Sequence, residues 1–214
     1  MRIIAGIHRS RKLQGPRPGD LTTRPILDRV KQALFDRLWN MGMFPEPDAE
    51  GTLRADGNVL DIFSGTGSMG LEALSRGSAH CTFIERDRYA LTALRENITA
   101  LGCQDEATVL SVDALSLASI NLLPRKPVRL VFLDPPYEMM LEEDKAARVA
   151  GLIAALGTMP GVAPGDRPGV MEPTGVLVLR TPIEADPPTV AGWSPPEVHA
   201  YGKMRLAFYR KATK

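Results

Sequence analysis

Short apolar runs alternate with segments of helical periodicity along the middle of the chain. The runs are rich in β-branched and aromatic residues and are bounded by glycine, proline and polar clusters, so each predicts a strand. The expected strands are 58–63, 80–85, 107–113, 128–134 and 175–180. Because helical segments separate consecutive strands, we expect an α/β fold built on a mostly parallel, doubly wound sheet.

Apolar residues that repeat every three or four positions predict two helices. One stripe consists of Leu91, Leu94, Ile98 and Leu101, and Gly102 follows it as a typical helix end. The other stripe consists of Leu27, Val30, Leu34 and Leu38. Thr23-Arg24-Pro25 precedes it, and proline is tolerated in the first turn of a helix.

Glycine, proline and polar residues interrupt this pattern in three places. Residues 41–57 and 157–173 predict loops. Residues 197–201 and 203–211 flank Gly202, which predicts a C-terminal hairpin that adds antiparallel strands to the sheet.

The composition narrows the class of protein. A chain of 214 residues, 44% hydrophobic and 24% charged, can bury one substantial core. No apolar run is long enough to cross a bilayer, and the basic start of the chain lacks the apolar stretch of a signal peptide. Cys81 and Cys103 have neither metal-ligand nor disulfide-framework spacing, so we expect two reduced thiols and no metal. We therefore expect a cytoplasmic monomer without membrane contact.

Charge is unevenly distributed, although its sum is only +1. Residues 1–31 contain eight basic and two acidic residues, residues 199–214 contain five basic and no acidic residues, and the middle is acidic. Such separation suits a chain whose ends meet a polyanion, although a solvated tail has the same composition. We expect residues 1–40 to form a basic N-terminal extension and helix, and residues 41–214 to form the main domain. The candidate polyanion contacts are Arg9, Arg11, Lys12, Arg24 and Arg29.

A glycine-rich turn follows the first predicted strand. Gly65, Gly67 and Gly70 form a G-x-G-x-x-G pattern between a strand and a helix, where glycine permits a tight turn and close approach of a ligand to the backbone. A dinucleotide and S-adenosylmethionine both suit this pattern.

Acidic residues at the strand ends bear on that choice. Asp61 lies four residues before Gly65, where a carboxylate would repel a pyrophosphate but suits a ligand with an ammonium and a sulfonium group. Glu85 ends the second strand and can accept hydrogen bonds from the ribose hydroxyls of either cofactor. Asp113 ends the third strand, either near an adenine amino group or as a helix N-cap. The expected cofactor contacts are Asp61, Phe63, Ser64, Gly65, Gly67, Gly70, Glu85, Arg86, Asp113 and Ala114.

The strand at 128–134 ends in Asp134-Pro135-Pro136-Tyr137, the most specific signal in the chain. The prolines fix two φ angles and remove two backbone donors, which leaves a stiff rim of carbonyl acceptors. The exocyclic amine of a base is a poor nucleophile, but the Asp134 carboxylate and the Pro135 carbonyl can hold its hydrogens and turn its lone pair toward a methyl donor. Tyr137 can stack on the extracted base. The alternative is an ordinary strand followed by a turn.

With both motifs, the chain resembles the RsmD family of bacterial 16S ribosomal RNA guanine-N2 methyltransferases. The matching segments are RIIAG, RSRKL, TRP, DRVKQALFDRL, DIFSGTGSMGLEALSRG, FIERD, LDPPY and YGKMRLAFY, which span nearly the whole chain. Because LDPPY is shared with many amino-directed methyltransferases, the N-terminal segments are what indicate this family.

The resemblance implies a class I, Rossmann-like methyltransferase fold with S-adenosylmethionine as cofactor. It implies as target the guanine conventionally numbered 966 in 16S ribosomal RNA, either free or in a small-subunit assembly intermediate. The catalytic candidates are then Asp134, Pro135 and Tyr137, and the basic residues near the N-terminus become candidate RNA contacts. The chain departs from the family pattern at His8, Ser10, Ile26 and Arg180, and the last position is often acidic.

The sequence alone is also compatible with other functions. A DNA adenine N6 methyltransferase, or one acting on another RNA, would use the same chemistry. An NAD-dependent oxidoreductase would share the glycine turn but gives no reason for Asp61 or for the two prolines. A non-catalytic RNA-binding module would need only the basic ends.

Overall fold

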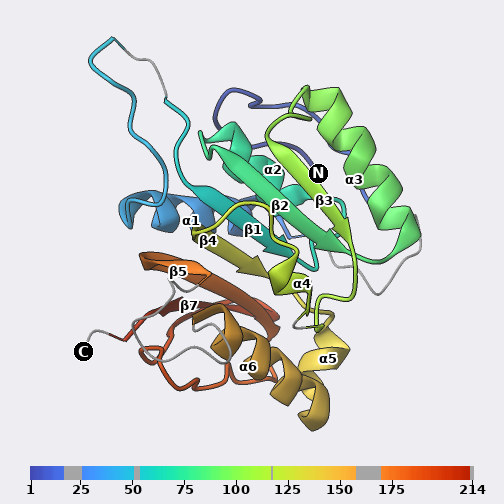
Figure 1. The fold of residues 1–214 in the computed structure, drawn as a ribbon, viewed down its shortest axis with the longest axis vertical. Helices are drawn as coiled ribbons and strands as arrows, with labels where there is room; N and C mark the ends of the chain where they lie inside the picture. Colours follow the sequence, from blue (N-terminus) through green and yellow to red (C-terminus); the bar gives the residue numbers. More distant parts are fainter. Residues whose placement is uncertain (17–25, 51–53, 117, 158–169, 213–214) are drawn as a thin grey trace.

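A seven-stranded sheet forms the centre of the molecule in the computed structural model (Figure 1). The structure describes residues 1–16, 26–50, 54–116, 118–157 and 170–212. The strands are β1 Asn58–Ile62, β2 His80–Glu85, β3 Ala107–Ser111, β4 Val128–Leu133, β5 Met171–Pro182, β6 Glu197–Tyr201 and β7 Met204–Arg210. Their order across the sheet is β3-β2-β1-β4-β5-β7-β6. The first five strands are parallel, and the β6–β7 hairpin continues the sheet antiparallel to β5.

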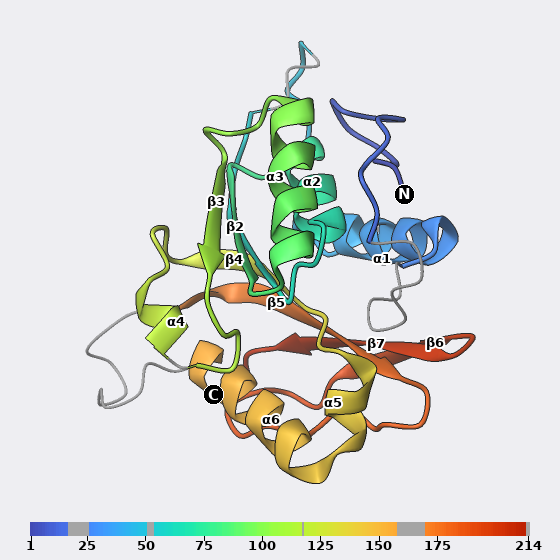
Figure 2. The same cartoon turned by 90° about the vertical axis from the view of Figure 1, so that its right-hand side faces the viewer.

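Helices cover both faces of this sheet, as Figure 2 shows. They are α1 Asp28–Asn40, α2 Ser68–Ser75, α3 Arg88–Leu101, α4 Ala118–Asn121, α5 Tyr137–Leu141 and α6 Glu143–Gly157. The first three lie on one face and the last three on the other. The described part of the chain contains no helix with the length and apolar character needed to cross a membrane.

Two hydrophobic cores result because successive side chains of a strand point to opposite faces. Val59 and Phe83 face the core under α1, α2 and α3, whereas their neighbours Leu60 and Ile84 face the core under α4, α5 and α6. Burial on both faces explains why these strands are continuous apolar runs without a polar alternation. The predicted doubly wound α/β fold with a C-terminal antiparallel hairpin is confirmed.

Most predicted strand boundaries agree with the structure to within two residues, but the second predicted loop extends too far into the following strand. Gly157 is the last residue of α6, and β5 begins at Met171, before the expected start of its strand. The early part of β5 is irregular, because Val128 of β4 pairs with Met171 whereas Leu130 pairs with Val176. Residues 158–169 lie outside the described residues.

The N-terminal segment packs on the body of the protein. Ile3 and Leu13 are buried in the core that α1, α2 and α3 share with the sheet. Gly6 has a φ of +81°, and a Cβ there would lie 1.7 Å from the Ser75 carbonyl oxygen at the end of α2, so only glycine fits this approach. Residues from both sides of the expected boundary at residue 40 contribute to this core.

A buried carboxylate fastens this segment to α1 and α2. The backbone N–H groups of Ile4 and Ala5 donate to the two oxygens of Glu72, at 2.8 and 3.0 Å. Lys31 Nζ lies 3.1 Å from one of these oxygens and Arg76 Nε 3.0 Å from the other. Glu72 thus joins the N-terminal segment, α1 and α2, which the sequence patterns did not connect.

Candidate active site

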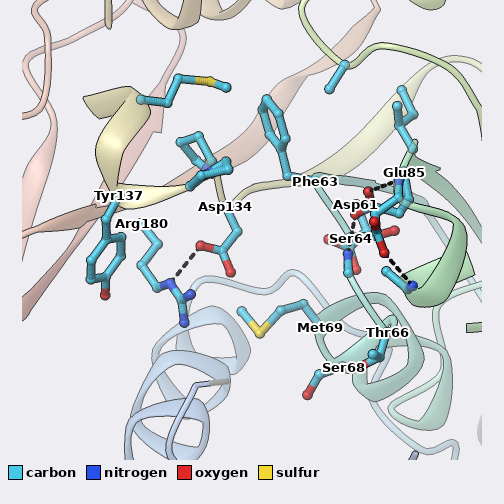
Figure 3. Close-up of a pocket in the computed structure, with 18 of the residues that line it drawn as sticks. Asp61, Phe63, Ser64, Thr66, Ser68, Met69, Glu85, Asp134, Tyr137 and Arg180 are labelled. Atoms are coloured by element: carbon cyan, nitrogen blue, oxygen red, sulfur yellow. Dashed lines mark hydrogen bonds and ion pairs between the residues drawn. The ribbon is translucent and has the colours of Figure 1, made fainter. Parts of the chain in front are cut away.

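A cavity of about 890 Å³ opens at the carboxyl ends of β1, β2, β4 and β5. The strand order reverses between β1 and β4, because the chain proceeds from β1 to β2 on one side and returns to β4 on the other. Ligands of doubly wound folds bind at such a switch point. Figure 3 shows that residues of the glycine-rich turn lie at one end of the cavity and Asp134, Tyr137 and Arg180 at the other.

The turn after β1 contains three residues in the left-handed backbone region. Phe63, Gly65 and Gly67 have φ values of 58°, 54° and 85°. A positive φ is unusual for a bulky residue such as Phe63 and costs conformational energy. Phe63, Ser64 and Gly65 line the cavity, as predicted for cofactor contacts.

Two of the predicted glycine contacts lie behind the cavity. Gly67 precedes α2 as its N-cap, and a Cβ there would meet Leu94 at 2.4 Å. A Cβ on Gly70 would meet Phe83 at 2.4 Å, so this glycine allows α2 to lie close against β2. Neither is among the residues that line the cavity, and both shape the turn from behind.

Asp61 is a buried acid beneath the turn, with 1% of its surface exposed. Its Oδ2 accepts a hydrogen bond from the Gly70 N–H at 2.8 Å, and the residue also lines the cavity. Burial raises the pKa of Asp61 well above its ordinary value, and the nearby carboxylates of Asp134 and Glu85 raise it further. The side chain therefore fixes the turn and presents a poorly solvated acid to any ligand in the cavity.

Glu85 organises the other side of the turn. Its Oε2 accepts from Gly65 N–H at 2.8 Å, and its Oε1 accepts from the N–H groups of Arg86 and Asp87 at 2.7 and 2.8 Å. A carboxylate has about four acceptor sites, so these bonds leave capacity for a further donor. Glu85 and Arg86 both line the cavity.

At the end of β3, Asp113 does not reach the cavity, although the sequence suggested that it contacts the cofactor. Asp113 accepts a hydrogen bond from Leu115 N–H at 3.0 Å and lies 3.6 Å from Arg86 Nη1, but it does not line the cavity. Its neighbours Val112 and Ala114 do. Asp113 thus holds the turn after β3, and it is not a helix N-cap, because α4 begins only at Ala118.

The Asp134-Pro135-Pro136-Tyr137 segment follows β4 directly beside the glycine-rich turn. The Asp134 N–H donates to the Ile62 carbonyl of β1 at 3.2 Å, and Tyr137 begins α5. Asp134, Pro135 and Tyr137 all line the cavity. Burial raises the pKa of Asp134, and the ion pair with Arg180 opposes that rise.

The chain is similar in sequence to known methyltransferases. A family model described as "Conserved hypothetical protein 95" matches residues 1–159. "Ribosomal RNA small subunit methyltransferase D" of Escherichia coli strain K12 is 30% identical over 212 residues, which cover 99% of this chain and 90% of that protein. The chain belongs to the RsmD methyltransferase family.

Two further proteins are similar to this chain over nearly its whole length. The Bacillus subtilis protein named "Putative rRNA methyltransferase YlbH" is 30% identical over 212 residues, 99% of either chain. The solved structure of "Putative methyltransferase yhhF from Escherichia coli" matches with a TM-score of 0.69 at 28% identity, covering 100% of this chain and 99% of that one. The class I methyltransferase fold expected for an RsmD-family chain is thereby confirmed.

The predicted RNA contacts of this family member fall into two groups. Arg9, Arg11 and Lys12 are exposed, and Arg11 donates to the Ala100 carbonyl near the C-terminal end of α3 at 2.8 Å. Arg29 is exposed in the first turn of α1, close to Ile26 of the cavity wall. Arg24 lies outside the described residues. Within the first group, Lys12 pairs with Arg2, the residue after Met1, and Met1 lines the cavity.

Arg180 is the site residue that the motifs missed. Its Nε donates to Asp134 Oδ1 at 2.6 Å, and its guanidinium carbon lies 5.6 Å from the centroid of the Tyr137 ring. Leu133 of β4 pairs with Leu179 of β5, which brings the two following residues side by side. The ends of two adjacent predicted parallel strands were the available signal, because residues there share one edge of the sheet.

Proposed function

We propose that this protein transfers a methyl group from S-adenosylmethionine to the exocyclic N2 amine of a guanine in 16S ribosomal RNA. The observation that carries the proposal is the meeting of two motifs in one cavity. The glycine-rich turn and its acidic supports lie at one end, and the Asp134 to Tyr137 segment lies at the other. This is the arrangement needed to bring a bound cofactor and an extruded base together.

The residues at the turn fit S-adenosylmethionine. Asp61 offers a buried carboxyl group whose ionised form an ammonium group beside it would stabilise. Glu85 is oriented by three backbone donors with capacity to bind a ribose hydroxyl. Ile84, Val112 and Ala114 give the same end of the cavity an apolar part that suits an adenine ring. When bound, the cofactor supplies an electrophilic methyl group on a sulfonium centre.

The chain's own residues then act on the amine. The Asp134 carboxylate and the Pro135 carbonyl accept its two hydrogens, so that its lone pair turns out of conjugation with the ring and toward the methyl group. Tyr137 stacks on the base and holds it out of the RNA. These acceptors also stabilise the positive charge that develops on nitrogen during transfer.

Proton removal completes the reaction. Formation of the N–CH₃ bond breaks the S–CH₃ bond and leaves a cationic secondary amine that must lose one proton. Burial raises the pKa of Asp134, which makes its carboxylate a better proton acceptor than an exposed aspartate. Asp134 thus takes the proton and passes it to solvent in our mechanism.

The named relatives support ribosomal RNA as the substrate, because those from Escherichia coli and Haemophilus influenzae are called small-subunit ribosomal RNA methyltransferases. We expect the protein to act in the cytoplasm as a monomer, on free 16S RNA or on an assembly intermediate that contains it. Exposed arginine and lysine side chains near the N-terminus provide candidate phosphate contacts for that substrate.

The decisive experiment is transfer of labelled methyl groups to RNA from cells that lack the protein, followed by mapping of the modified base. We expect one labelled guanine in 16S RNA, methylated on N2. Parallel assays with protein-bearing subunit intermediates and with adenine-containing DNA identify the preferred substrate. Label on DNA adenine would overturn the proposed target, and RNA affinity without any label would overturn the proposed reaction.

A further inference from the structure

Arg180 contacts two candidate catalytic residues at once, Asp134 and Tyr137. Arg180 contacts one oxygen of Asp134 through Nε while its guanidinium faces the Tyr137 ring, and Figure 3 shows it between these two side chains. We propose that Arg180 is a positioning residue for methyl transfer, which holds Oδ1 of Asp134 so that Oδ2 accepts the target amine, and which keeps the Tyr137 ring beside the base. The identity of that amine rests on the proposed function.

The backbone of Arg180 is rigid enough for this role. It lies within β5, between β4 and β7, and pairs with Leu206 of β7. Its side chain is only 9% exposed, so its stem has little freedom to swing into solvent. Sites built on strands in the middle of a sheet are held more precisely than sites on loops.

The charges around Asp134 make its protonation state sensitive to Arg180. The other carboxylates along the cavity belong to Asp61, Glu85, Asp87, Glu138 and Glu184, from β1, β2, α5 and the loops after β2 and β5. Among the described residues, the cationic side chains along the cavity are those of Arg86 and Arg180, and Arg86 lies against Asp113. Arg180 is therefore the cation that directly opposes proton uptake by Asp134, whose pKa is already raised by burial.

Loss of Arg180 has two consequences for the amine. Without the Nε contact, the carboxylate of Asp134 can rotate and no longer presents a fixed acceptor. Without the positive charge, Asp134 binds a proton at higher pH, and a protonated carboxyl donates a hydrogen where the amine needs an acceptor. Both changes slow methyl transfer, and only the second is reversed by raising the pH.

The test compares Arg180→Met and Arg180→Lys with the wild type by two measurements. One is the pH dependence of single-turnover methyl transfer, and the other is a carboxyl carbon NMR titration of Asp134, assigned with Asp134→Asn. We expect Arg180→Met to raise the Asp134 midpoint and the acidic limb of the rate profile by about one pH unit or more. Arg180→Lys should restore the midpoint to within about half a unit yet remain about tenfold slower, because lysine lacks the planar Nε contact.

Arg129→Met is the matched control. It removes another partly buried arginine, one that pairs with Asp56 and Glu172 far from the reacting segment, and should leave rate and titration unchanged. An unchanged Asp134 titration in folded Arg180→Met would overturn the inference. If the methionine variant does not fold, a wild-type rate in Arg180→Lys overturns it instead. Absence of methyl transfer by the wild type contradicts the proposed function, whereas the NMR titration still decides the role of Arg180.

Discussion

At the scale of single residues, Asp61 combines a structural and a binding role. It accepts a hydrogen bond from Gly70 within the fold and, in our proposal, provides charge for the cofactor ammonium. Burial raises its pKa, so the ionised form is disfavoured in the free protein, and a cofactor ammonium beside it would favour that form again. A substitution that keeps the acceptor but removes the charge separates the two roles.

We predict that Asp61→Asn weakens S-adenosylmethionine binding without destabilising the protein. The loss should be about tenfold to a hundredfold, because a hydrogen bond to a charged group contributes about 1.5–3 kcal/mol. Calorimetry measures the affinity, and urea unfolding near pH 7.5 measures stability. Since a raised pKa favours the neutral acid, removing the charge should leave the free energy of unfolding at that pH unchanged or higher. Unaltered affinity would remove Asp61 from the cofactor site.

For Asp134, we predict that Asp134→Asn slows single-turnover methyl transfer by a hundredfold or more, on the order seen when a positioned acceptor is lost. Cofactor affinity should stay within a few-fold, because the partner of Asp134 is the target amine. The wild-type rate should also fall as the pH decreases through the raised pKa of Asp134, since the reactive form is the carboxylate. A decrease of less than about tenfold in the variant would contradict the mechanism.

Several candidate site residues that the motifs indicated lie around one cavity, whereas Gly67, Gly70 and Asp113 do not line it. Phe63, Gly65, Glu85 and Asp134 all line the cavity. The partner that completes the reacting site, Arg180, is 46 residues from Asp134 and belongs to no motif. Such a contact depends on which strands are neighbours, and a single sequence does not state this directly.

At the scale of elements, the buried Glu72 joins the N-terminal segment, α1 and α2. We predict that Glu72→Ala lowers the free energy of unfolding by about 3–5 kcal/mol, because it leaves Lys31 and Arg76 buried without their shared carboxylate. Urea denaturation measures the change.

Asp28→Ala is the matched control for this prediction. It removes the Arg2–Asp28 pair, whose side chains are 60% and 45% exposed, and should cost about 1 kcal/mol or less. Equal losses in the two variants would show that Glu72 does not fasten these elements.

The start of β5 and the end of α6 were harder to predict than the central strands. Strands β1, β2 and β4 are buried on both faces and read as apolar runs, so the sequence predicts them directly. In contrast, β5 begins with Met171-Glu172-Pro173, where proline normally argues against a strand. Helix α6 contains Gly151 and adjoins the predicted Gly/Pro-rich loop, so local sequence marks its end poorly. Its C-terminal residues are held by packing in the core that α4, α5 and α6 share with the sheet.

At the scale of the whole molecule, Arg9, Arg11 and Lys12 are exposed residues of the N-terminal segment that do not themselves line the cavity. We predict that the triple change Arg9→Ala, Arg11→Ala, Lys12→Ala weakens RNA binding strongly at low salt and much less at high salt. Each lost phosphate contact should flatten the plot of log affinity against log salt by roughly 0.7–0.9 units. Cofactor affinity should stay the same.

A control of equal charge tests the location of this surface. Arg125→Ala, Lys145→Ala and Arg148→Ala remove three exposed cations from other parts of the fold and should leave the salt plot nearly parallel to that of the wild type. Parallel plots for the N-terminal variant would instead favour the solvated-tail alternative and move the RNA surface, most simply to the basic hairpin of β6 and β7.

The N-terminal segment also forms part of the cavity wall, because Met1 and Pro16 line it. An affinity tag fused ahead of Met1 would therefore start at the rim of this cavity, where it would obstruct the RNA substrate that we propose. A tag appended after the last strand starts beyond residues 211 and 212, neither of which lines that cavity. Purification handles for kinetic work on this protein belong at its C-terminal end.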